Sequence, residues 1–307
     1  MVLGTGGTIA GRAATPSSLA YESARIGVGA LVAALTAHRR VASEQVAQLD
    51  SKDMDFATWQ RLAEAVERHL KRPEVAGVVI THGTDTIEET AYFLSRVIDA
   101  TRPVVLTAAM RPATSFEADG PRNLADAIVV AGAGASAGAT GVLVAFAGEI
   151  HAARDVCKAH PYRLDAFTSG ESGPLGRVDE GRIAMIRPWP TVARALDLAA
   201  LPVDESSWPW VEIVTSVAGS DGRVVEMLAE RGVAGIVVAA TGNGTVHRAL
   251  AGALDRAMAR GIAVLRSTRC LDGRIVEDEP GRFPSAGDLT PVKARIELIL
   301  DLLARRA

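Results

Sequence analysis

The sequence predicts an α/β protein with two domains of unequal size, and three observations lead to this prediction. Short apolar segments alternate with segments whose apolar residues recur every three or four positions, which is typical of a parallel sheet covered by helices. The alternation breaks once, around residues 187–210, and then resumes. The chain has 307 residues, enough for two cores, and 48% are hydrophobic but only 4% aromatic, so Ala, Val, Leu and Ile must fill those cores.

The first part of the chain contains the clearest alternation of strands and helices. Short, β-branched, apolar segments predict a brief strand at the N-terminus and buried strands over residues 75–81, 103–108 and 141–146. Segments with helical spacing predict helices over residues 55–70, 86–98 and 121–135. Asp55 is suited to an N-cap, and Pro121 is suited to the first turn of a helix.

Four prolines punctuate residues 187–210, where no period is visible, and this stretch predicts a connection between domains. Strands are then expected over residues 211–217, 235–239 and 262–266, and helices over 222–231, 246–260 and 291–305. We therefore expect an N-terminal catalytic domain over residues 1–188, a linker over 189–210 and a C-terminal α/β domain over 211–307.

Charge, hydropathy and cysteine content exclude several classes of protein. The net charge is -3 and no basic run exceeds two residues, so we expect no nucleic-acid partner. No segment approaches the roughly 18 consecutive apolar residues of a membrane helix, so we expect no membrane association. Cys157 and Cys270 lie far apart and form no disulfide framework, which favours a reducing cytoplasm.

The first candidate motif is the glycine-rich segment that runs from Gly4 to Gly11. It partly matches a dinucleotide-binding loop, but Ile9 stands where the third glycine belongs. It also suits a structural turn whose threonines bond the backbone. A third interpretation is a loop that presents a hydroxyl nucleophile, with small neighbours that let a substrate approach. All three stay open on this segment alone.

The second candidate motif comprises residues 81–86, Thr-His-Gly-Thr-Asp-Thr, between a predicted strand and a predicted helix. Thr or Asp before a helix is usually an N-cap, so capping is the simpler explanation of this segment alone. Three hydroxyls, an imidazole and a carboxylate exceed what one cap requires. A helix N-terminus also offers N–H donors to an oxyanion, so a catalytic role is the alternative.

Further polar segments at residues 50–53, 109–112, 119–121 and 154–158 follow apparent strands. Ligands of open parallel sheets bind beyond the carboxyl ends of the strands, so we expect every candidate motif to lie just after a strand. The chain has only four lysines, among them Lys52 and Lys158. A buried lysine, unlike an arginine, can lose its proton and act as a base.

Two of these segments resemble the signature motifs of the bacterial L-asparaginase/glutaminase-asparaginase family. They are residues 5–10, Thr-Gly-Gly-Thr-Ile-Ala, and residues 77–87, Gly-Val-Val-Ile-Thr-His-Gly-Thr-Asp-Thr-Ile. The similarity continues through residues 88–94, 109–112, 118–121, 173–176 and 242–244, so it spans nearly the whole chain. It implies a larger flavodoxin-like N-terminal domain with a parallel sheet and a smaller α/β C-terminal domain.

The resemblance implies a role for each matching residue. Thr8 corresponds to the nucleophile, with Tyr21 as its hydrogen-bond partner, and Thr84, Asp85 and Lys158 form a second cluster. The remaining positions would bind substrate: Ser51 and Asp85 hold the α-carboxylate and α-ammonium, and Lys52, Ala109, Thr245 and Glu277 complete the set. Thr245 and Glu277 would come from a neighbouring subunit of a homotetramer, a dimer of dimers. No cofactor is implied, and no cluster of metal ligands is visible.

Lys52 is a departure from the family pattern, because many members carry Gln at this position. A cation there would repel the substrate ammonium. We therefore expect Lys52 either to point away, paired with a carboxylate such as Asp53, or to lie beside the substrate's α-carboxylate.

The function that follows is hydrolysis of L-asparagine, with L-glutamine as a side substrate. Thr8 would attack the amide carbon and form an acyl-enzyme, and water would then hydrolyse the ester. A neutral Lys158, favoured by burial beside Thr84, would assist proton transfer. The alternatives are a noncatalytic amino-acid or nucleotide-binding protein, and an ammonia-supplying amidase subunit of a tRNA amidotransferase.

Overall fold

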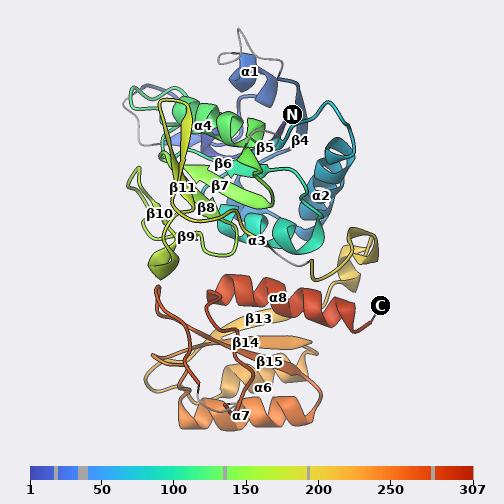
Figure 1. Ribbon diagram of the computed structural model, residues 1–307. Coiled ribbons are helices and arrows are strands. Elements are labelled where there is room, and N and C mark those ends of the chain that lie inside the picture. The colour runs from blue at the N-terminus through green and yellow to red at the C-terminus, as the bar shows by residue number, and fades with distance from the viewer. Residues whose placement is uncertain (17–19, 34–40, 134–136, 192–193, 278–280, 307) are drawn as a thin grey trace. The chain divides into compact units, whose positions relative to one another are not determined.

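The computed structural model describes residues 1–16, 20–33, 41–133, 137–191, 194–277 and 281–306 (Figure 1). The chain divides into two compact units, Met1–Leu198 and Ala199–Ala307. Both units are α/β, as predicted, and the division falls inside the expected linker of residues 189–210. The ends of that linker stay a prediction.

An eight-stranded mixed sheet forms the first unit, in the order β12-β11-β8-β7-β6-β5-β1-β4. Five strands are parallel: β4 (Ser43–Leu49), β1 (Val2–Gly6), β5 (Val78–Thr81), β6 (Val104–Thr107) and β7 (Val142–Phe146). Three antiparallel strands extend the sheet beyond β7: β8 (Glu149–Ala152), β11 (Gly176–Asp179) and β12 (Arg182–Met185). The parallel part was predicted, whereas the antiparallel extension was not.

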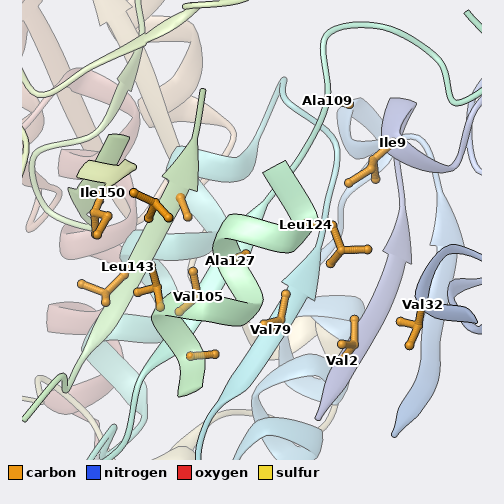
Figure 2. Packing of buried hydrophobic residues seen from close by; sticks show 14 of the residues in the cluster. Val2, Ile9, Val32, Val79, Val105, Ala109, Leu124, Ala127, Leu143 and Ile150 are labelled. Carbon is orange, nitrogen blue, oxygen red and sulfur yellow. The ribbon is translucent and has the colours of Figure 1, made fainter. Parts of the chain in front are cut away.

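Helices cover both faces of this sheet. On one face, α1 (Val28–Ala33) and α4 (Gly120–Gly132) pack on a row of register-matched residues that includes Val2, Val79 and Val105. Figure 2 shows Leu124 and Ala127 of α4 in this cluster. Because side chains alternate along a strand, the next residues of each strand face the opposite side.

The second pair of helices, α2 (Phe56–Leu70) and α3 (Ile87–Val97), packs together through the stacked rings of Trp59 and Phe93. Asp55 caps α2 as predicted, because its carboxylate accepts the Thr58 N–H at 2.7 Å. The end predicted at residue 135 for the helix that is α4 lies outside the described residues.

The order of the parallel strands determines where a ligand can bind. From β1 the chain crosses to β4 on one side, and then to β5 on the other side of β1. This is the 2-1-3-4-5 order of flavodoxin-like sheets, whose topological switch point lies between β1 and β5. A crevice outside the carboxyl ends of these two strands is the expected binding position.

The second unit is a smaller three-layer structure. Its parallel sheet has the order β13 (Val211–Thr215), β14 (Gly235–Ala240), β15 (Ala263–Thr268). Helices α6 (Arg223–Glu230) and α7 (Arg248–Ala259) pack together over one apolar cluster, and α8 (Pro291–Ala304) contacts all three strands. In Figure 1, α8 lies on one face of this sheet and α6 and α7 on the other.

The remaining elements are short. Two-residue strands form two small hairpin sheets, β2 (Arg12–Ala13) with β3 (Tyr21–Glu22), and β9 (Cys157–Lys158) with β10 (Phe167–Thr168). One-turn 3₁₀ helices are η1 (Thr8–Ala10), η2 (Ser51–Asp53), η3 (Gly170–Ser172), η4 (Leu198–Ala200) and η5 (Glu205–Ser207). Of the helices in the described part of the chain, none is long and apolar enough to cross a membrane.

Candidate active site

Three loops meet at the carboxyl ends of β1, β4 and β5. A Cβ on Gly7 would lie 2.4 Å from the Gly83 Cα, and a Cβ on Gly83 would lie 2.3 Å from the Ser51 Oγ. Both distances are far inside van der Waals contact, so only glycine allows these backbones to approach so closely. Gly7 also has φ = 79°, which favours glycine for a second reason. The loops therefore bring Thr8, Ser51 and Thr84 to the switch point.

Thr8 begins η1 at the end of β1 and is 7% exposed. Its Oγ1 lies 2.8 Å from the hydroxyl oxygen of Tyr21, which stands on β3. The pairing of β3 with β2 places Tyr21 above the loop that carries Thr8. A hydroxyl paired with a second, more exposed hydroxyl can pass its proton outward when it attacks an electrophile.

A second cluster joins Thr84, Asp85 and Lys158. The amine of Lys158 donates to the Thr84 Oγ1 at 2.9 Å and lies 2.5 Å from the Asp85 Oδ1. The Lys158 side chain is 16% exposed and the Asp85 side chain 55% exposed. The amine thus faces a hydroxyl and a carboxylate rather than a purely apolar pocket.

The segment that carries Lys158 follows a strand, as we expected of every candidate motif, but that strand is the antiparallel β8. Lys158 itself lies within β9, a separate two-residue strand paired with Phe167 of β10. The residues before it turn back after the antiparallel strand β8, where the Asp155 and Val156 N–H groups donate to the Ala152 carbonyl. Lys158 therefore reaches the site from a hairpin outside the main sheet.

The helix-capping interpretation of residues 81–86 does not hold in the structure. Thr86 occupies the N-cap position of α3, but its side chain makes no capping hydrogen bond. Its hydroxyl donates instead to the Ser51 carbonyl at 2.7 Å, and the Asp85 N–H donates to the Ser51 Oγ at 3.3 Å. The Thr84 hydroxyl and the Asp85 carboxylate are directed to Lys158. The polar groups that could cap α3 thus join its loop to the Ser51 loop and to the β9–β10 hairpin that carries Lys158.

His82 lies fully buried next to this cluster. Burial lowers the pKa of its imidazole to about 4, so the ring is neutral at pH 7. The Trp59 Nε1–H donates to the Thr90 Oγ1 at 2.8 Å, which leaves the Thr90 hydroxyl to donate to the His82 Nε2 at 3.0 Å. The His82 Nδ1–H then donates to the Gly83 carbonyl at 2.8 Å. This chain of donors fixes the backbone immediately before Thr84.

Lys52 adopts the first of its two expected arrangements. Its amine lies 2.9 Å from Asp53 and 3.2 Å from Asp50, and its side chain is 60% exposed. The hydrogen bonds that this amine donates to Asp53 and then to Asp50 raise its pKa. The positive charge is therefore engaged by carboxylates of its own turn.

Ala109 is fully buried just after β6. Asp119 braces this loop, because its two carboxylate oxygens accept the Met110 and Arg111 N–H groups at 2.9 Å each. Asn123 adds a bond to the Ala108 carbonyl at 2.9 Å. The sequence motifs included Asp119 but did not predict that it holds the 110–111 backbone. That contact depends on the position of Asp119 at the start of α4.

Thr245 and Glu277 lie together in the second unit. Residues 241–245 form a tight turn after β14, in which the Thr241 and Thr245 hydroxyl oxygens are 2.8 Å apart. Arg266 links this turn to Glu277, since its guanidinium donates to the Gly244 carbonyl at 3.0 Å and pairs with the Glu277 carboxylate. Arg266 was not among the predicted site residues.

Two other expectations concern bound groups. Gly4 and Gly6 lie within β1, so the backbone there is a strand and not a dinucleotide-binding loop. Within the described ranges, no group of three or more His, Cys, Asp or Glu side chains is arranged to hold a metal ion.

Comparison with known proteins identifies the family. The profile described as "Asparaginase, N-terminal" matches residues 1–191, and the profile described as "Glutaminase/Asparaginase C-terminal domain" matches residues 210–306. The chain belongs to the asparaginase family. The resemblance of the two motifs, and the two-domain α/β fold that it implied, are confirmed.

Individual asparaginase relatives match over nearly their full length. L-asparaginase 2 of Escherichia coli strain K12 is 38% identical, covering 98% of this chain and 88% of that protein. Glutaminase-asparaginase of Pseudomonas fluorescens biotype A is 36% identical, covering 96% and 84%. A crystal structure described as probable cytoplasmic L-asparaginase from Campylobacter jejuni superposes with a TM-score of 0.89 at 36% identity, covering 98% and 94%. The asparaginase fold therefore extends through both units.

Proposed function

We propose that the protein hydrolyses the side-chain amide of L-asparagine to give L-aspartate and ammonia, with L-glutamine as a secondary substrate. The observation that carries the proposal is the paired arrangement of two threonines on adjoining loops. Thr8 is paired with a tyrosine hydroxyl, and Thr84 with a lysine amine and a carboxylate. Relatives named L-asparaginase and glutaminase-asparaginase support the same substrates.

The proposed reaction has two steps. The Thr8 Oγ1 attacks the amide carbon, the carbon–nitrogen bond breaks, and the hydroxyl proton leaves on ammonia, which produces an acyl-enzyme ester. Water then attacks the ester, and its proton returns to Thr8 as aspartate is released. Backbone N–H groups beside Thr8 and Thr84 would stabilise the oxyanion, a contribution of about 3–4 kcal/mol for a well-placed donor. Lys158 and Thr84 would assist the proton transfers.

Binding of the amino acid would use the exposed groups of the same loops. Asp85, with a side chain 55% exposed, would accept the α-ammonium, while Ser51 would donate to the α-carboxylate. Buried Ala109 would line the site beyond β6. In this arrangement the side-chain amide is directed toward Thr8.

We also propose a cytoplasmic homotetramer, built as a dimer of dimers, in which Thr245 and Glu277 of one subunit complete the site of a neighbour. Cys157 and Cys270 form no disulfide, which supports the reducing compartment. The link through Arg266, which holds Glu277 beside the 241–245 turn, supports a shared role for the two residues.

The test is ammonia release from asparagine and glutamine by the unmodified protein, Thr8→Ala and Thr8→Ser. We expect release by the unmodified protein, a loss of about a thousandfold or more in kcat for Thr8→Ala, and partial activity for Thr8→Ser, which keeps a hydroxyl. Near-normal turnover by folded Thr8→Ala would overturn the assignment of the nucleophile. No release from either amide by the unmodified protein would favour a noncatalytic binding protein.

A further inference from the structure

Lys158 is held at two points by the segment that leads into α3. Its amine contacts Thr84 and Asp85, which precede the N-cap residue of the helix. Its main-chain N–H donates at 3.5 Å to the Oε1 of Glu88, in the first turn of the helix. Both ends of the lysine therefore depend on residues 84–88, although Lys158 belongs to β9.

Glu88 has an unusual environment for a carboxylate. Its Oε2 is buried and has no hydrogen-bond partner among the described residues, whereas most buried polar atoms are paired. An unpaired buried oxygen is destabilising, and more so when the group is charged. Its position in the first turn of α3 favours a negative charge, because helix N-termini attract anions.

The substrate adds a second cation to this cluster. The Asp85 Oδ1 lies 2.5 Å from the Lys158 amine, and the proposed function also assigns Asp85 to the substrate ammonium. One carboxylate must then face two cations. Glu88, three residues after Asp85, holds Lys158 at a different point, the main-chain N–H, so this contact is available when Asp85 engages the substrate.

We propose that Glu88 is a positioning residue for the reaction: it fixes the backbone of Lys158 through the main-chain N–H. The amine is thereby kept on the Thr84 hydroxyl when Asp85 engages the substrate. This inference rests on the proposed function, and it concerns catalysis rather than substrate binding, because Glu88 acts through the main chain of Lys158.

The test compares Glu88→Gln with Glu89→Gln, the neighbouring acidic residue of the same turn, for asparagine hydrolysis. Both variants remove one charge from the helix N-terminus, and Gln preserves the shape of Glu. We expect Glu88→Gln to lower kcat about tenfold, part of the roughly 10²–10⁴-fold that a positioned proton-transfer group contributes. KM should stay within about threefold, because Ser51 and Asp85 remain. Glu89→Gln should leave both constants near those of the unmodified protein.

The pH profile of kcat provides a readout that a purely structural role would not change. Without the Glu88 contact the Lys158 main chain is free to shift and its amine to move away from the Asp85 carboxylate, which favours the protonated form. The profile of Glu88→Gln should therefore move to lower pH. The profile of Glu89→Gln should not move. Equal kcat values and equal profiles for the two variants would overturn the proposal.

Two controls keep the outcomes distinct. Inactive unmodified protein would overturn the proposed function itself, whereas active protein with unaffected Glu88→Gln would overturn only the role of Glu88. If Glu88→Gln does not fold by circular dichroism, Glu88→Asp decides, since it keeps the charge but is one methylene too short to reach Lys158. A lowered kcat with unchanged KM supports positioning, and kcat equal to that of the unmodified protein overturns it.

Discussion

Lys52 stands immediately after Ser51, which the proposed function assigns to the substrate, yet its charge is directed elsewhere. Asp50 and Asp53 flank it on the same 3₁₀ turn, and both contact its amine. Two carboxylates attract the lysine amine, whereas the substrate ammonium would repel it, so the amine stays with the carboxylates. In the local sequence Asp-Ser-Lys-Asp, the two aspartates thus balance the positive charge that Lys52 brings in place of Gln.

Lys52→Gln should therefore have a small effect on catalysis. We expect KM for asparagine to stay within a few-fold of the unmodified value, or to fall slightly, because no substrate contact is lost and a nearby cation is removed. Steady-state kinetics at several ionic strengths measure this. A rise in KM well over tenfold would mean that the amine holds the α-carboxylate, contrary to the pairing with Asp50 and Asp53.

At the scale of residues, the sequence predicts the identity of site groups better than their contacts. Thr8, Thr84 and Asp85 stand in motifs that are continuous in the chain, so a single segment identifies them. The contact of Glu88 with Lys158 joins residues 70 positions apart. Such contacts depend on how β9 folds back to α3, which no local pattern encodes.

At the scale of elements, a strand can be predicted from the sequence when both of its faces are buried. Strands β5 and β6 are buried throughout, so they form the apolar runs that identify central parallel strands. Strand β4 lies at the sheet edge, alternates between half-buried and exposed positions, and has the polar sequence Ser-Glu-Gln-Val-Ala-Gln-Leu. Strands β8, β11 and β12 have only four residues each, too few to show a period. For these reasons the sequence analysis predicted no bounds for these four strands.

The loops after β1, β4 and β5 pack against one another at Gly83, which lies against Gly7 and Ser51. Gly83→Ala would place a methyl group 2.3 Å from the Ser51 Oγ, so the loop carrying Ser51 must shift. We expect KM to rise more than about tenfold and stability to fall by roughly 1–3 kcal/mol, the usual cost of overpacking. Kinetics and urea unfolding measure the two effects.

Gly132→Ala is the matched control for Gly83→Ala. It lies at the end of α4, and a Cβ there would meet no atom of another described residue within 4 Å. Alanine in a helix should increase stability by about 0.4–1 kcal/mol and leave KM unchanged. Unchanged kinetics in Gly83→Ala would show that the loops adjust without moving Ser51.

At the scale of the whole molecule, acid should destabilise the protein in two pH ranges. A hydrogen bond from the His69 side chain lowers the pKa of Glu44. A hydrogen bond from the Thr58 side chain likewise lowers the pKa of Asp55. Carboxylates with a lowered pKa contribute stability that is present above their unfolded pKa, near 4, and lost as pH falls further. His82 acts in an earlier range, because the pKa of an unfolded histidine is about 6.5 and burial lowers it to about 4 in the folded protein.

The sign of the His82 effect follows from proton binding. Between pH 6.5 and pH 4 the unfolded chain binds a proton at this imidazole and the folded chain does not, so the free energy of unfolding falls as pH falls. From pH 7 to pH 5 this residue alone should remove on the order of 2 kcal/mol. Urea unfolding at the two pH values should show this loss in the unmodified protein and a smaller loss in His82→Asn. Asn offers an amide N–H where the Nδ1–H donates to Gly83, but it cannot take up a proton in this range. Equal losses in both proteins would show that other groups cause the acid sensitivity above pH 5.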